Sequence, residues 1–205
     1  MNKEEGNPVP TFDLSGWLDK LCRDIARRVP ELSHIEAERV LFCLSRSRAP
    51  GKHGVYARIA PLRYAGGKQE TALRRGRYRE LYALPRLRHE GREILYLVYL
   101  MIPRLLRLPF REKLRTIIHE LYHISPDFDG DIRRFPGRNY AHGSSRAAYN
   151  QRIDTLVTAW LDQSPDKELL EPLHLREEDW ISGTIRLTGL RVPLPRAQLV
   201  SRRRT

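Results

Sequence analysis

The stretch "TIIHELYHISPDFDGD", residues 116–131, decides the fold because it combines a helical apolar pattern with two histidines four residues apart. Apolar side chains recur on one helix face at Leu114, Ile117, Ile118, Leu121 and Ile124. His119, Glu120 and His123 line the neighbouring stripe. The pattern therefore predicts a helix over 110–124 that packs on a core and carries both imidazoles at the edge of its buried face.

The spacing of the two histidines indicates a metal site. Histidines at positions i and i+4 lie on one helix face, roughly 5–6 Å apart at Cβ, which suits two ligands of one zinc ion. A glutamate directly after the first histidine can take a proton from a water held by the metal. The pattern favours His119 and His123 as zinc ligands with Glu120 as catalytic base. The alternative is a pair of incidental surface histidines.

A third ligand has to come from elsewhere in the chain. Metzincins need a glycine and a histidine where Pro126 and Asp129 stand, so that class is excluded. A gluzincin would take a glutamate from the following helix; 146–163 contains none, and Glu168 and Glu171 after it are a weak option. His142 is favoured because it stands just before that helix, where Gly143 permits a sharp turn.

The acidic run Asp127, Asp129 and Asp131 is the alternative source of the third ligand. It superficially resembles a calcium loop, but Arg138 occupies the twelfth position, where an EF-hand needs glutamate. One of these carboxylates could instead hold the second nitrogen of a ligand histidine. A solvated turn explains the run equally well.

A peptidase also needs a donor for the oxyanion that develops during attack. The candidates are Tyr140, Tyr149, Arg133 and Arg138. The sequence does not choose among them. Tyr122, inside the motif, is better explained by packing.

The segments before the motif predict one helix and three strands. Helical spacing extends over 12–29, and Pro30 ends it. Buried strands are predicted over 39–46 and over the apolar segment 93–102. Alternation over 55–64 predicts a half-buried strand that pairs back on the strand before it.

The segments after the motif predict a helix and a last strand. Ser144 and Ser145 are good N-caps for a helix over 146–163. A final strand is expected within 183–194, and "SRRRT", 201–205, is expected to fray.

The domain organisation follows from these segments. We expect a flexible lead over 1–11, a catalytic domain over 12–163 and a C-terminal extension with a strand and a basic tail over 164–205.

The charge is strongly basic, with a formal net charge of +12 over 205 residues. Such a balance suggests contact with a polyanion, most simply nucleic acid, and a soluble protein with a basic surface explains it equally well. The segment 73–92 is the most basic internal stretch and places Tyr78 and Tyr82 among arginines. Arginine for phosphates and tyrosine for stacking would suit nucleic acid, but for this stretch alone a solvated surface with two packed tyrosines is favoured.

The compartment is predicted from what the sequence lacks. Cys22 and Cys43 form no CxxC pair, which excludes a zinc ribbon and fits a reducing cytoplasm. The N-terminus has no apolar leader, and the longest apolar run, 94–103, is too short to span a bilayer. We therefore expect a cytoplasmic protein without a membrane partner.

The stretch "HELYHISPDFDGDIRRFPGRNYAHGSS", 119–145, resembles the motif region of the putative phage metallopeptidase family of bacteriophage and prophage genomes. The resemblance implies a zincin-like fold with His119, His123 and His142 on zinc and Glu120 as base. It also implies that the cytoplasm is that of a bacterial host cell. The layout is also similar to the SprT-like metalloproteases, whose HExxH is followed by a later His-Gly. This chain lacks the C-terminal zinc ribbon of many SprT-like members.

Together these features predict an α+β, zincin-like fold in which a small antiparallel or mixed sheet packs on the HExxH helix and a second helix. The expected activity is that of a zinc-dependent metallopeptidase of phage or prophage type, acting on a protein or peptide. One alternative is a nucleic-acid-binding protein with a structural zinc, contacting nucleic acid through its basic surface. Another is a zinc amidase acting on a non-protein substrate. A closed site with four protein ligands would favour the nucleic-acid-binding protein. An open cleft beside a sheet edge would favour the peptidase.

Overall fold

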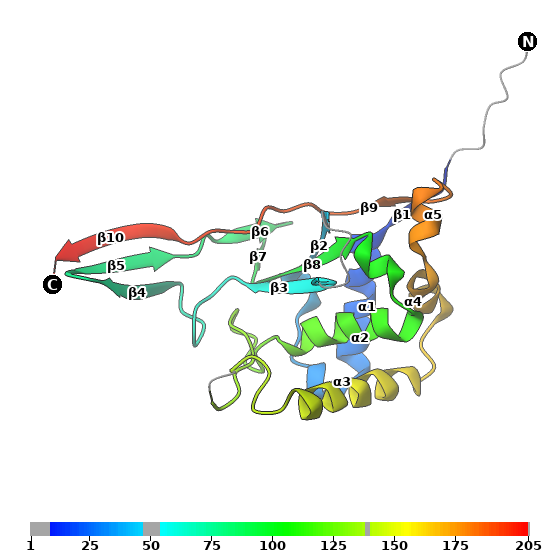
Figure 1. Ribbon diagram of the computed structural model, residues 1–205, viewed down its shortest axis with the longest axis horizontal. Helices are drawn as coiled ribbons and strands as arrows, with labels where there is room; N and C mark the ends of the chain where they lie inside the picture. Colours follow the sequence, from blue (N-terminus) through cyan, green and yellow to red (C-terminus); the bar gives the residue numbers. More distant parts are fainter. Residues whose placement is uncertain (1–8, 47–53, 138–139, 205) are drawn as a thin grey trace, which may run out of the picture.

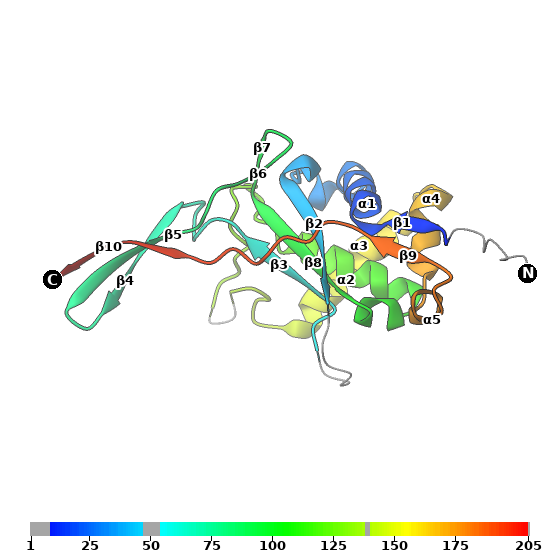
Figure 2. The ribbon, with the colours of Figure 1, turned by 90° about the horizontal axis from the view of Figure 1, so that it is seen from above.

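The chain forms a helical body from which a three-stranded arm projects, as Figures 1 and 2 show. The computed structural model describes residues 9–46, 54–137 and 140–204. The body contains β1 (Thr11–Asp13), α1 (Leu14–Arg28), β2 (Val40–Arg46), β3 (Ala57–Pro61), β6 (Leu87–His89), β7 (Arg92–Ile94), β8 (Tyr96–Ile102), α2 (Phe110–Tyr122), α3 (Arg146–Leu161), α4 (Lys167–Leu170), α5 (Glu177–Ile181) and β9 (Arg186–Thr188). The arm contains β4 (Glu70–Arg75), β5 (Tyr78–Ala83) and β10 (Gln198–Arg204). None of the helices in these described ranges is long and apolar enough to cross a bilayer.

The central sheet is built around β8. Its strand order is β2-β8-β3, with β2 parallel and β3 antiparallel to β8. The predicted pairing of 55–64 with 39–46 is therefore wrong, because β8 lies between the two strands. The reason is that β8 is buried along nearly its whole length, and a strand apolar on both faces needs a partner on each side.

The helices cover one face of this sheet. Val98 and Leu100 of β8 face α1 and α2 in the main core, whereas Leu97 and Tyr99 face the opposite side. Helix α3 packs against α2 on the side away from the sheet. The helices predicted over 12–29 and 146–163 are confirmed as α1 and α3. The α+β, zincin-like fold class is likewise confirmed, with a mixed sheet packed on α2.

The C-terminal segment runs across the whole molecule. β9 pairs in parallel with β1, Leu190 then bridges to Cys43, and β10 pairs with β5 in the arm. The strand predicted within 183–194 is thus reduced to the short β9. The predicted fraying of "SRRRT" is wrong for 201–204, because the edge of β5 offers backbone partners that a local pattern cannot reveal.

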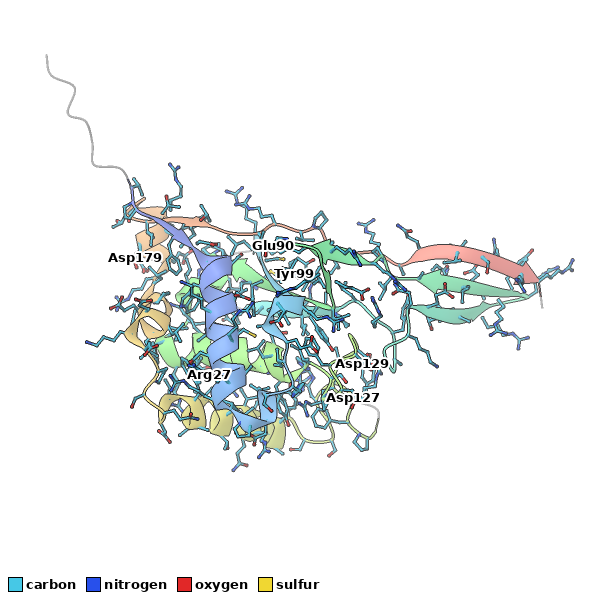
Figure 3. The ribbon with its side chains drawn as sticks, turned by 180° about the vertical axis from the view of Figure 1, so that it is seen from behind. Arg27, Glu90, Tyr99, Asp127, Asp129 and Asp179 are labelled. Carbon is cyan, nitrogen blue, oxygen red and sulfur yellow. The ribbon has the colours of Figure 1, made fainter. Side chains whose placement is uncertain are left out.

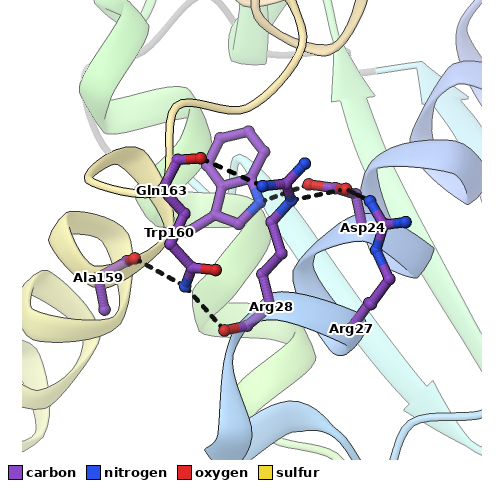
Figure 4. A network of polar contacts seen from close by, with 6 residues as sticks. All are labelled: Asp24, Arg27, Arg28, Ala159, Trp160 and Gln163. Carbon is purple, nitrogen blue, oxygen red and sulfur yellow. Dashed lines mark hydrogen bonds and ion pairs between the residues drawn. The ribbon is translucent and has the colours of Figure 1, made fainter.

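A buried polar network ties α1 to α3 (Figure 4). Trp160 is fully buried, and its Nε1 donates to Asp24 Oδ2 at 3.0 Å. Arg28 and Arg27 donate to the other carboxylate oxygen of Asp24. Burial acts to raise the pKa of Asp24, but the hydrogen bonds from Arg28, Trp160 and Arg27 outweigh it and hold the pKa below its usual range. The carboxylate is therefore charged at neutral pH and satisfies the indole N–H.

We expect Asp24→Ala to lower the free energy of unfolding by about 2–3 kcal/mol, because it leaves a buried indole N–H without a partner. Urea denaturation measures this difference. The matched control is Asp19→Ala on the same helix, where the carboxylate forms an exposed pair with Arg23. That variant should lose less than about 1 kcal/mol. Equal losses in the two variants would show that the buried network contributes no special stability.

Candidate metal centre

Helix α2 carries the first two histidines, and its rotation is set by burial. The apolar stripe predicted for this helix is buried, with Leu114 and Leu121 at 0% exposure. The helix begins at Phe110 after Pro109 and ends at Tyr122, so His123 occupies the C-cap position. The backbone of His123 is still helical, with φ −70° and ψ −15°, and the four-residue spacing from His119 is therefore kept.

Three histidine rings converge on one point. His123 Nε2 lies 3.1 Å from His119 Nε2, and His142 Nε2 lies 3.4 Å from His119 Nε2. All three potential ligand atoms lie within 4.8 Å of one another. Two imidazole nitrogens on a tetrahedral zinc ion should be about 3.3 Å apart. The donor set and its spacing therefore fit such an ion.

His142 reaches the cluster through the turn before α3. Gly143 has φ +72°, in the left-handed region that favours glycine. Two residues later the Ser145 side chain accepts a hydrogen bond from Ala148 N at 3.2 Å and caps α3, as predicted. The structure thus brings together the three histidines singled out in the sequence, and their role as ligands stays a prediction.

The acidic run lies outside this cluster. Asp127 and Asp129 lie on the loop between α2 and α3 (Figure 3), and the potential ligand group found among the described residues consists of histidines alone. Asp131 accepts hydrogen bonds from Gly66 N at 3.1 Å and from Arg134 Nε at 2.7 Å. These contacts indicate that Asp131 stabilises the conformation of the loop.

The same loop also fixes the end of α2. Arg133 N donates to His123 O at 2.6 Å, and Ile124 bridges to Ile132. The loop therefore holds the second histidine of the motif from its backbone side.

Tyr149 of α3 packs against the whole cluster. Its ring centroid lies 5.2 Å from that of His119, 5.7 Å from that of His123 and 4.9 Å from that of His142. Its hydroxyl lies 3.4 Å from His123 Nδ1. If His123 bound a metal through Nε2, its Nδ1 would carry the proton and donate to this hydroxyl.

The other candidate oxyanion donors are placed elsewhere. The Tyr140 side chain is about half exposed and lies under Arg134. The guanidinium of Arg133 lies over the ring of Tyr122, and its Nε donates to Tyr122 O. Arg138 lies outside the described residues. Of the three candidates that the structure describes, Tyr149 is the one at the histidine cluster.

Glu120 is buried between α2 and the sheet edge. It is 8% exposed, and its Oε2 accepts a hydrogen bond from Ile59 N of β3 at 2.8 Å. Burial raises the pKa of Glu120 to about 7, against the opposite effects of the Ile59 N–H and the Arg58 charge. A carboxyl group with such a pKa can exchange protons near neutral pH.

Burial has the opposite effect on the imidazoles. It lowers the pKa of His119 to about 4, and it also holds the pKa values of His123 and His142 below their usual range. All three rings are therefore neutral at pH 7, and a neutral imidazole is the form that binds a metal.

One family of known proteins matches the chain. A family model described as a putative phage metallopeptidase matches residues 15–150. The matched range contains the central sheet, α2, the three histidines and Tyr149. No curated protein and no solved structure gives a significant match.

We expect purified wild type to bind one equivalent of zinc and His142→Ala to lose most of it, because only two ligands remain. Mass spectrometry of the intact protein and of total metal measures the stoichiometry. His174→Ala is the matched control, since His174 is exposed and stacks on Phe110 away from the cluster. Full zinc occupancy in His142→Ala would contradict the three-histidine site.

Tyr149→Phe removes the hydroxyl beside His123 and keeps the ring. We expect zinc affinity to fall roughly 10-fold, because the tautomer and orientation of His123 are no longer held. Competition with a chromophoric chelator measures the dissociation constant. Tyr140→Phe should leave it unchanged. If both variants bound zinc like the wild type, Tyr149 would have no positioning role.

Proposed function

The chain belongs to the putative phage metallopeptidase family, and from this premise we propose that it is a zinc-dependent peptidase. In this proposal His119, His123 and His142 are the metal ligands and Glu120 is the general base. The observation that carries it is the convergence of three histidine Nε2 atoms, two of them from the motif of α2 that also contains the buried Glu120.

The donor set supports zinc and an open coordination position. Imidazole nitrogens at tetrahedral spacing suit zinc, and three protein ligands leave the fourth position for water or substrate. A structural zinc site normally has four protein ligands. In the described parts of the chain the cluster contains three, which favours a catalytic centre over the structural-zinc alternative.

The side chains around the cluster match the needs of amide hydrolysis. A zinc ion there would polarise the substrate carbonyl and acidify water. Glu120, with its pKa near 7, would accept the proton of the attacking water and pass it to the leaving amine. Burial raises the pKa of Tyr149, so its hydroxyl stays protonated and remains a hydrogen-bond partner for His123.

The position of Glu120 favours a peptide as the substrate. Its carboxylate is bonded to Ile59 of β3, which is the edge strand of the central sheet. An extended peptide can add to such an edge as a further strand. A peptide laid along β3 would therefore pass beside Glu120, an arrangement that a small non-protein amide would not require.

We expect Glu120→Gln to keep one zinc per chain and to cleave peptides at least about 100-fold more slowly than the wild type, because the proton acceptor is lost. The assay incubates zinc-loaded protein with a mixed peptide library and reads cleavage by mass spectrometry. Glu112→Gln, in the exposed first turn of the same helix, is the matched control and should remain active.

Two results would count against the proposal. Peptide cleavage by Glu120→Gln at the wild-type rate would remove Glu120 from the mechanism. Zinc-loaded wild type that leaves the whole library intact but hydrolyses a simple N-acyl amide would support the amidase alternative.

A further inference from the structure

The arm concentrates positive charge on a sheet that has little core of its own. Residues 70–83 and 198–204 contain seven arginines and two glutamates. Most side chains of β4 and β10 are exposed. The three strands extend away from the body in both views (Figures 1 and 2). Burial of apolar surface therefore does not explain the composition of the arm.

Three arginines lie side by side across one face of the arm. Arg74 of β4 pairs in register with Arg79 of β5, and Arg79 pairs in register with Arg203 of β10. All three side chains are exposed, and within the described residues none of them forms an ion pair. Like charges directly opposite each other destabilise a sheet. Fold stability alone would not favour this row.

The opposite face of the arm carries Arg75, Arg202 and Arg204 with one glutamate. Glu80 is 5% exposed and forms ion pairs with Arg75 at 3.5 Å and with Arg202 at 3.1 Å. Arg202 also lies over the ring of Tyr78, and Tyr82 donates to Glu80 at 2.8 Å. Both tyrosines of the basic stretch are thus engaged here, on the face away from the arginine row. Two of the three arginines on this face thus have a carboxylate partner, whereas none in the row has one among the described residues.

We propose that the row formed by Arg74, Arg79 and Arg203 binds the phosphate backbone of double-stranded DNA. Three guanidinium groups without an ion-pair partner complement a polyanion and can each contact a phosphate. The row spans two strand spacings, roughly 10 Å, which is comparable to the width of a DNA groove. Contacts of this kind are independent of base sequence.

The neighbours of the row favour a duplex over a single strand. Proteins that bind single strands stack bases on aromatic side chains. The side chains two residues along the same face are Ala72, Leu81 and Ser201, none of which is aromatic. Tyr78 and Tyr82 point to the other face. The row therefore offers phosphate contacts without a stacking platform.

The base of the arm is fixed to the loop beside the metal centre. Arg63 N donates to Gly130 O at 3.0 Å, and Gly66 N donates to Asp131. Gly130 has φ +89°, and a Cβ there would lie 2.5 Å from the Arg63 side chain, so the two segments meet closely. DNA on the arm would therefore be held beside the body. The proposal does not depend on peptidase activity.

The test measures binding of a labelled duplex of about 20 base pairs by fluorescence anisotropy over a range of salt concentrations, with the full chain. We expect the triple variant Arg74→Gln, Arg79→Gln and Arg203→Gln to bind at least about 10-fold more weakly. The slope of log K against log salt should become shallower by about 2.7, since each phosphate contact contributes about 0.9. The melting temperature should stay equal or rise, because like charges are removed.

The control makes the same charge change on the body, with Arg111→Gln, Arg152→Gln and Arg186→Gln. All three of these side chains are exposed and lie outside the arm. The control should keep the wild-type slope. An equal loss in the two triple variants would assign binding to the whole basic surface and overturn the proposal. Duplex binding by the arm variant at wild-type strength, or tighter binding of single-stranded DNA by the wild type, would overturn it as well.

Discussion

The arrangement of this protein depends on the burial of one stripe of α2. Leu114, Ile118 and their neighbours on that stripe lie in the main core, and each such side chain contributes roughly 1.5–3 kcal/mol when removed from water. The helix therefore cannot rotate about its axis without losing several of these contributions. The adjoining stripe is held in place by the same packing. His119 and His123 consequently face α3, while Glu120 faces the edge of β3.

A second constraint is the path of the chain after α2. The loop returns to the helix end through the bond from Arg133 N to His123 O and then turns at Gly143 into the capped start of α3. Because of that path, His142 in the turn before α3 and Tyr149 within α3 both lie next to the histidines of α2. The geometry of the histidine cluster therefore depends on the packing of α3 on α2.

Two carboxylates, Asp24 in the body and Glu80 in the arm, are buried and form ion pairs with arginine partners. In the body, Asp24 is buried together with its partners, so its charge stabilises the contact between α1 and α3. In the arm, the row centred on Arg79 has no compensating carboxylate within the described residues. Ion pairs such as those of Asp24 stabilise the fold. Exposed arginines without a carboxylate partner do not, and we therefore relate them to a binding partner. One chain thus combines a candidate hydrolytic centre with a face suited to a polyanion.

The sequence by itself determined the elements that depend on near neighbours: α2 with its two histidines, the Ser145 cap of α3, the apolar strand β8 and the resemblance that marks His142. Periodicity and capping act over a few residues and can be seen locally. Tertiary structure alone decided that β8 lies between β2 and β3, that Glu120 is bonded to Ile59, and that the C-terminal arginines complete the arm. These features join residues far apart in the chain, and their stability comes from packing and pairing that no local pattern encodes.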